Sequence, residues 1–111
     1  PQGFFVLTVN GQLAGFAASH SRWIWNGKVG GEIHELVIAP AFRSRGLGKL
    51  LLEHVIRYLF SRGRRHIGLW VGVGNEVAKA LYRKTGFHPE GSFGVWERWV
   101  LKGPSNRSQG Q

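Results

Sequence analysis

The chain has 111 residues, no cysteine and a formal net charge of +9, and 42% of its residues are hydrophobic. This length suits one small domain with a core of its own, and the composition argues against intrinsic disorder. The lack of cysteine excludes disulfides, cysteine–metal sites and a cysteine nucleophile, so we expect a cytoplasmic protein. No apolar run is long enough to span a bilayer and none resembles a secretion signal, whereas the net charge would attract polyanions.

The pattern of apolar residues predicts a mixed α/β fold. Two strands, 4–9 and 13–20, are joined by Asn10-Gly11, a pair that strongly favours a tight hairpin turn. We interpret residues 21–30 as a loop or strand-edge segment. The later elements expected are a strand over 32–38, a helix over 47–60, a strand over 67–73, a helix over 76–85 with Asn75 as its N-cap, and strands over 87–91 and 95–101. Residues 1–102 form the predicted domain, and 103–111 a flexible polar tail.

The segment Arg43-Ser44-Arg45-Gly46-Leu47-Gly48-Lys49, which we call the cradle, lies between the strand over 32–38 and the long helix. Main-chain N–H groups at the beginning of a helix have no partner within the helix, and the helix dipole adds partial positive charge there. The two glycines allow close approach of a ligand, and three cationic side chains add full charges. The segment therefore predicts a diphosphate site, although an ordinary basic helix start would look similar.

The spacing Arg-x-x-Gly-x-Gly after the strand Leu36-Val37-Ile38 resembles the acetyl-CoA motif of the GCN5-related N-acetyltransferase (GNAT) superfamily. A second match follows, because Asn75, Ala78, Leu81-Tyr82 and Gly86-Phe87 resemble the later Asn…Leu-Tyr…Gly-Phe pattern of the family. The resemblance implies a mixed, mostly antiparallel sheet flanked by helices, with acetyl-CoA as the acetyl donor.

The two matches cover residues 32–87, and the ends of the chain agree with the family in strand pattern only. The family usually has a further strand and two helices before this point, and these normally help to build the acceptor site. Their absence and the first residue, proline, indicate an N-terminally truncated fold. Either the chain is part of a larger domain, or a second subunit completes a minimal fold. Strands near the C-terminus often pair across subunits in this family, so we expect a homodimer.

The resemblance also implies roles for single residues. The residues it assigns to acetyl-CoA binding are Val37, Ile38, Arg43, Arg45, Gly46, Leu47, Gly48, Lys49, Asn75 and Tyr82. Those of the cradle would anchor the diphosphate. The backbone of Val37 and Ile38 would pair with the pantetheine arm, and one of their N–H groups would polarise the thioester carbonyl. Tyr82 resembles the family tyrosine that protonates the departing thiolate. Tyr82 would serve equally well as a core residue, and Asn75 as a helix N-cap.

Glu32 and His34 are the candidate general bases. Two residues apart on a strand, they share a face with Leu36, whereas Glu35 is expected on the other face. The family often places Glu or His here to take the proton of the amine, and an imidazole titrates near neutral pH. Both could instead be surface residues of an edge strand, and a bulge near Gly30-Gly31 would turn Glu32 away.

These observations favour an acetyl-CoA-dependent N-acetyltransferase that acts by direct transfer to a primary amine of a small molecule or peptide, without a metal. One alternative is a non-catalytic acetyl-CoA-binding regulatory domain, which the missing N-terminal elements favour. Another is a basic nucleic-acid-binding module, which the net charge and the five tryptophans favour. No nucleic-acid recognition motif is present, and we expect neither nucleic acid nor membrane as a partner.

Two further groups of residues bear on ligands. The basic cluster at 62–66 could bind a phosphate at the adenosine end of CoA, contact nucleic acid or be a solvated loop. Aromatic side chains could line an acceptor pocket, and the candidates are Trp23, Trp25, Phe93, Trp96 and Trp99. Because the chain has only 6 acidic residues, a small neutral or acidic amine, or a peptide N-terminus, suits it better than a polycation.

Overall fold

The structure, a computed structural model, describes residues 3–103. Its elements are β1 (Phe4–Val9), β2 (Gln12–Trp25), β3 (Lys28–Ile38), a 3-10 turn (Pro40–Phe42), α1 (Leu47–Ser61), β4 (His66–Gly72), α2 (Glu76–Lys84), β5 (His88–Phe93) and β6 (Trp96–Lys102). This order confirms the predicted succession of strands and helices and the mixed α/β class. The predicted tail lies, from residue 104 onward, outside the described residues.

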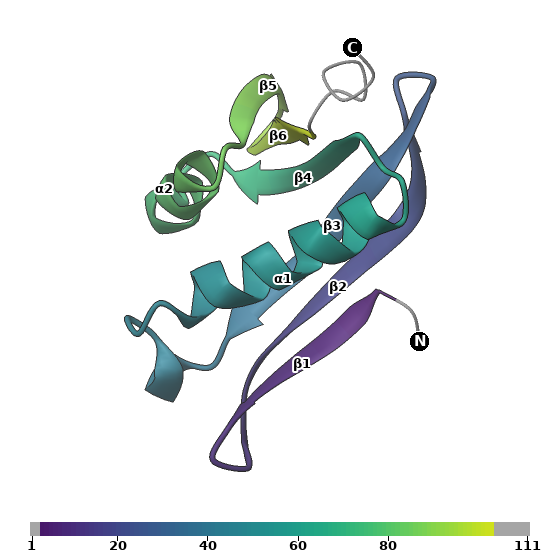
Figure 1. Cartoon of the computed structure of the whole chain (residues 1–111). Coiled ribbons are helices and arrows are strands. Elements are labelled where there is room, and N and C mark those ends of the chain that lie inside the picture. Colours follow the sequence, from purple (N-terminus) through teal and green to yellow (C-terminus); the bar gives the residue numbers. More distant parts are fainter. Residues whose placement is uncertain (1–2, 104–111) are drawn as a thin grey trace.

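The six strands form one sheet in the order β1-β2-β3-β4-β6-β5 (Figure 1). All neighbouring strands are antiparallel except β3 and β4, which are parallel and pair only through Gly31–Ile33 and Ile67–Leu69. Beyond Ile33, β3 continues to Ile38 beside β2 alone. The sheet therefore opens between its two parallel strands.

Of the two interpretations of residues 21–30, the loop was wrong, because all of them except the turn residues 26 and 27 belong to strands. They form the far part of a long β2–β3 hairpin, whose turn residues Asn26 and Gly27 have φ values of 52° and 75°. Asn10 and Gly11 close the β1–β2 hairpin in the same way. The pairing of β2 with β3 shifts register twice, between Ala18 and Ser19 and again before Trp23. These shifts interrupt the polar–apolar alternation that marks a strand in a sequence.

One face of the sheet is covered by α1, which crosses the strands in Figure 1. Five buried side chains, which recur with the period of a helix turn, make up the inner face of the helix: Leu51, Leu52, Val55, Ile56 and Leu59. They pack with Ile33, Leu69 and Trp99 of the sheet in a single core. Trp99 is 1% exposed, so the expectation that it lines an acceptor pocket was wrong.

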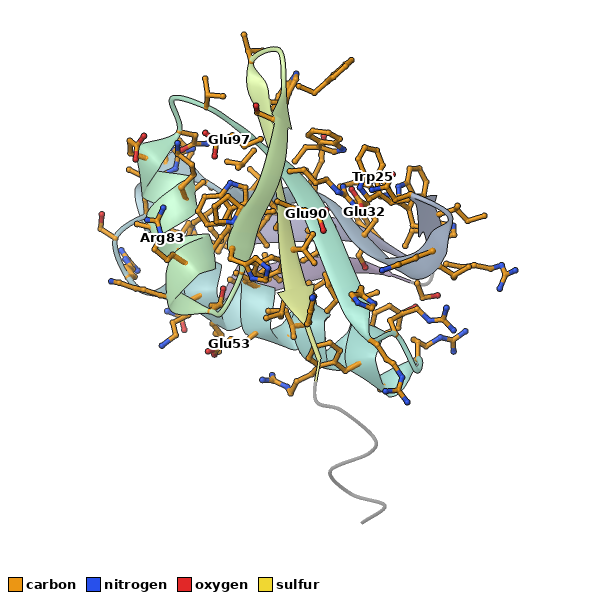
Figure 2. The ribbon with its side chains drawn as sticks, turned by 90° about the horizontal axis from the view of Figure 1, so that it is seen from above. Trp25, Glu32, Glu53, Arg83, Glu90 and Glu97 are labelled. Atoms are coloured by element: carbon orange, nitrogen blue, oxygen red, sulfur yellow. The ribbon has the colours of Figure 1, made fainter. Side chains whose placement is uncertain are left out.

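On the same face, α2 lies beside the end of β4 (Figure 1), and its Arg83 stacks on the ring of Trp99 at 5.0 Å. Within residues 3–103 no helix covers the opposite face of the sheet. Trp23 and Trp25, the latter shown in Figure 2, are 39% and 38% exposed there. Neither of the two described helices has the length and apolar character that crossing a bilayer requires.

Candidate active site

The beginning of α1 presents main-chain N–H groups that no described side chain caps. Its N-cap residue, Gly46, has φ 77°, and no acidic residue lies in the first turn. Ser44, two residues earlier, also has a positive φ, 65°. In α2, by contrast, Asn75 Oδ1 accepts a hydrogen bond from Ala78 N at 3.2 Å, and Glu76 lies in the first turn. The start of α2 is satisfied internally, whereas that of α1 can bind an external anion.

A groove of about 700 Å³ begins at this end of α1 and runs between β3 and α2. It is lined by Leu36, Val37, Ile38, Phe42, Arg43, Ser44, Gly46, Leu47, Gly48, Asn75, Val77, Ala78, Leu81 and Tyr82. Of the residues assigned to acetyl-CoA binding, only Arg45 and Lys49 are not part of this lining. The guanidinium of Arg45 lies over the ring of Phe42 at 5.3 Å, and Lys49 is exposed on α1.

The cradle is fixed to the end of β3, where Arg43 Nε donates a hydrogen bond to the carbonyl oxygen of Ile38 at 3.0 Å. Gly48 has room for a side chain within the fold, because a Cβ there would lie 3.5 Å from Leu81 Cδ2, an ordinary contact. The glycine is therefore not required by packing. A side chain at Gly48 would instead occupy space at the groove.

The groove continues into a cleft of about 230 Å³ at the point where β3 and β4 separate. Four residues line both: Leu36, Val37, Asn75 and Tyr82. The cleft adds His34 and Glu35 from β3 and Trp70 and Trp96 from the other side of the opening. Beyond Ile33 the backbone of β3 has no pairing with β4, so its polar groups on that edge remain available to a ligand.

Tyr82 lies at the junction of groove and cleft. Its ring packs beside Phe87 at 5.7 Å and borders the hydrophobic core. Burial raises the pKa of the Tyr82 hydroxyl above its usual value. The phenol therefore keeps its proton at neutral pH and can donate a hydrogen bond, or the proton itself, into the cleft.

A bulge in β3 places His34 in the cleft. Ile33 and Glu35 pair with successive residues of β2, so His34 is an extra residue between them. The bulge changes the alternation of β3, and Leu36 packs on the core side with Ile33. The expectations that Leu36 shares a face with His34 and that Glu35 points away were therefore wrong, because Glu35 lines the cleft beside His34. No glycine or proline marks this bulge in the sequence.

Glu32 does not line the cleft, so the structure separates the two predicted bases. Its side chain is buried, and its two carboxylate oxygens accept hydrogen bonds from Arg98 Nη1 and Nη2 at 2.6 and 2.7 Å. The guanidinium of Arg98 lies over the rings of Trp25 and Trp70, at 4.6 and 5.3 Å from their centroids. Figure 2 shows Trp25 and Glu32 close together. A carboxylate whose oxygens are both held by a guanidinium is poorly suited to accept a proton.

Gly68 allows this ion pair to form across β4. It pairs with Glu32 in the sheet, and a Cβ at Gly68 would overlap with Arg98 Nη2. Arg98 Nε is buried and has no hydrogen-bond partner among the described residues. Sequence reasoning missed Arg98 because it is 66 positions from Glu32. The available signal was a glycine inside a predicted strand, which often marks the close approach of another group.

The basic cluster at 62–66 lies at the opposite end of α1 from the cradle. A helix of 15 residues is about 22 Å long, so these side chains are remote from an anion bound at the cradle. This position argues against a role in holding the diphosphate. It leaves all three interpretations open, namely a contact with a phosphate at the adenosine end of CoA, a contact with nucleic acid and a solvated loop.

Comparisons with known proteins connect this geometry to a family. The sequence profile of the "Acetyltransferase (GNAT) family" matches residues 1–87. An uncharacterized N-acetyltransferase of Methanocaldococcus jannaschii is 43% identical over 102 residues, which are 90% of this chain and 45% of the relative. Streptothricin acetyltransferase of Streptomyces lavendulae is 38% identical over 87 residues, 76% of this chain and 43% of the relative. The chain thus spans about half the length of these curated relatives.

Solved structures show the same fold. A crystal structure of a protein from Pyrococcus horikoshii aligns with a TM-score of 0.87 at 34% identity, covering 93% of this chain and 66% of that one. PaiA N-acetyltransferase from Thermoplasma acidophilum, whose structure was solved in complex with coenzyme A, aligns with a TM-score of 0.78 at 25% identity. That alignment covers 89% of this chain and 59% of the neighbour.

Proposed function

Because the chain belongs to the acetyltransferase (GNAT) family, we propose that its groove and cleft bind acetyl-CoA for transfer of the acetyl group to a primary amine. The observation that carries the proposal is that the groove and the cleft adjoin each other. The groove begins at the uncapped N-terminus of α1, and four of its lining residues, Tyr82 among them, also line the cleft that holds His34. The coenzyme A complex of the Thermoplasma acidophilum neighbour supports the same ligand class.

The chain offers a matching group for each part of this ligand. The free amides at Leu47 and Gly48, with the guanidinium of Arg43, suit a diphosphate. The edge of β3 at Val37 and Ile38 suits the amide-bearing arm, because this edge has no pairing with β4. When bound, acetyl-CoA would supply the acetyl group as an activated thioester.

In the proposed reaction His34 is the base and Tyr82 the acid. His34 accepts the proton that the amine nitrogen loses as its bond to the thioester carbonyl carbon forms. An N–H group of Val37 or Ile38 polarises the carbonyl oxygen. Tyr82 donates its proton to the sulfur as the carbon–sulfur bond breaks, and exchange with solvent restores both side chains.

Glu35 is the second candidate base, because it lines the same cleft as His34. Glu32 takes a different role in the proposal. Its ion pair with Arg98 joins β3 to β6 and stabilises the sheet beside the cleft.

Two further proposals concern the state of the protein. We propose a homodimer, because β1 and β5 are edge strands of the sheet and can pair with another chain. A molecular mass near 12.4 kDa in multi-angle light scattering would contradict it.

We also propose a cytoplasmic location, which the absence of cysteine supports. Fractionation of cells that produce the protein tests this location.

The cofactor proposal is tested by calorimetric titration with CoA. The wild type should bind, and Gly48→Val should lower the affinity at least about tenfold, because its side chain enters the groove where the diphosphate meets the helix. Gly91→Ala is the matched control, since a Cβ at Gly91 has nothing within 4 Å and should leave the affinity unchanged. Equal affinities for the wild type and a folded Gly48→Val variant would overturn the cradle as the anchor.

Turnover is measured as release of free CoA in the presence of acetyl-CoA and single amines. A disulfide reagent detects the thiol without background from the protein, which has no cysteine. His34→Ala should lower the rate on the order of 100-fold, most strongly at low pH, where few amines are neutral. Glu35→Gln is the parallel variant, and a larger loss there would transfer the role to Glu35. CoA binding without turnover of any amine would favour the regulatory-domain alternative.

A further inference from the structure

We propose that the acceptor subsite is a hollow at the inner end of the cleft, and that it takes a primary amine carried on a flat aromatic or apolar body. The hollow has a volume of about 350 Å³ and is lined by His34, Trp70, Phe93 and Trp96. We call it the aromatic hollow. This inference rests on the proposed function, because it assumes that the cleft holds the acetyl group.

Continuity with the cleft identifies the aromatic hollow as the place of the acceptor. His34, Trp70 and Trp96 line both cavities, and Tyr82 lies on the opposite side of the cleft. A ligand in the aromatic hollow therefore meets, at His34, a ligand that reaches from the groove into the cleft. This is the position that an attacking amine needs, with the base beside it and the acid beyond the thioester.

The lining of the aromatic hollow decides which amines fit. Three of its four residues are aromatic, and His34 is the only titratable one. Phe93 and Trp96 are 77% and 51% exposed, so a flat apolar body could remove a large aromatic surface from water. No carboxylate lines the hollow itself, because Glu35 lines the adjoining cleft and Glu90 borders two neighbouring cavities. A polyamine would find no counter-charge there.

Trp70, one wall of the aromatic hollow, is held in place before any ligand arrives. The ring of Trp70 packs edge-on against Trp25 at 5.2 Å and lies beside the guanidinium of Arg98, which Glu32 fixes in turn. Trp96 and Phe93 pair directly across the β5–β6 hairpin. A wall ordered in advance loses little side-chain entropy on binding, so it favours a ligand with a rigid flat body.

Three amines test the inference: 2-phenylethylamine, ethanolamine and spermidine. With acetyl-CoA, kcat/KM for 2-phenylethylamine should exceed that for the other two at least about tenfold. Trp96→Ala should lower that value about tenfold, mainly through a higher KM for the amine. The neighbouring Val95→Ala, which removes a side chain outside the hollow, should change neither.

Equal use of ethanolamine or spermidine, or an equal loss with all three amines in Trp96→Ala, would overturn the inference and leave the proposed function intact. Binding is measured separately, by equilibrium dialysis of 2-phenylethylamine with the CoA-loaded protein. Binding that Trp96→Ala weakens supports the aromatic hollow even if no amine is turned over, a result that would count against the proposed function alone. Absence of binding overturns the inference. Phe93→Ala replaces Trp96→Ala if the latter fails to fold.

Discussion

The cradle and the Glu32–Arg98 pair both concentrate charge, but they use it in opposite ways. The cradle draws its cations from seven consecutive residues, and among the described residues none of them forms a salt bridge. Arg98 is 4% exposed, and a carboxylate and two indole rings surround it. Cations without a carboxylate partner suit an anionic ligand, whereas a cation paired with a carboxylate of the protein stabilises the fold. Pairing and burial, rather than charge itself, therefore separate the proposed binding site from the structural one.

The largest effect is expected from a variant that breaks the Glu32–Arg98 ion pair. Arg98→Met leaves the carboxylate of Glu32 buried without its partner, so the free energy of unfolding should fall by about 3–5 kcal/mol. Urea denaturation measures it. The double variant Glu32→Leu/Arg98→Met should recover most of the loss, because two apolar side chains replace both charges. The exposed Arg57→Met should change stability by no more than about 0.5 kcal/mol. An Arg98→Met variant as stable as the wild type would contradict a structural role for the pair.

The next largest effect is expected at the proposed acetyl-CoA site. Tyr82→Phe removes the proposed acid and should lower kcat on the order of 100-fold while leaving CoA affinity unchanged. Steady-state kinetics with a turned-over amine, together with calorimetric titration, separates the two quantities. Full activity in Tyr82→Phe would remove the residue from the proton transfer and leave it a packing role beside Phe87.

Gly68→Ala tests whether the pair depends on the space above β4. The added methyl group would overlap with Arg98 Nη2, so stability should fall by about 1–3 kcal/mol. Gly72→Ala on the same strand is the matched control, because its Cβ would have nothing within 4 Å. Thermal unfolding compares the two variants. An equal effect of both would mean that the loss reflects glycine in a strand rather than the ion pair.

Asn75→Ala distinguishes the two roles expected for this residue. Loss of the N-cap hydrogen bond to Ala78 should cost about 1 kcal/mol of stability. If Asn75 also contacts the ligand, the affinity for CoA should fall as well, and titration measures this separately. Lys84→Ala, at an exposed side chain of α2 outside the groove, is the control. Unchanged stability would argue against the cap.

The smallest expected effect is a dependence of stability on alkaline pH. Burial raises the pKa of Tyr82 in the folded state, so the folded protein keeps the phenolic proton after the unfolded chain has lost it. This contribution is fully present below about pH 10 and is lost as the pH rises through the folded-state pKa. Stability curves from pH 9 to 11 should therefore fall less steeply for Tyr82→Phe than for the wild type. Parallel curves would contradict the raised pKa.

The sequence by itself determined the features whose causes are local. The order of the elements, the start of α1 at Leu47 and the cap at Asn75 all depend on residues a few positions apart, so a short window contains the whole signal. The cradle is predictable for the same reason, because its chemistry comes from the backbone of one turn. The family resemblance brought the two matched segments together in one cofactor site, and in the structure both segments line the groove.

Only the tertiary structure decided which charges and rings are available to a ligand. The sequence offers Glu32 as a candidate base, but Arg98, 66 positions away, donates hydrogen bonds to both of its carboxylate oxygens. The sequence offers Trp99 as a candidate pocket residue, but in the structure it is buried in the core. The bulge at His34 moved Glu35 into the cleft. Each outcome depends on contacts between strands far apart in the chain, and alternation along one strand carries no information about what its neighbours bring.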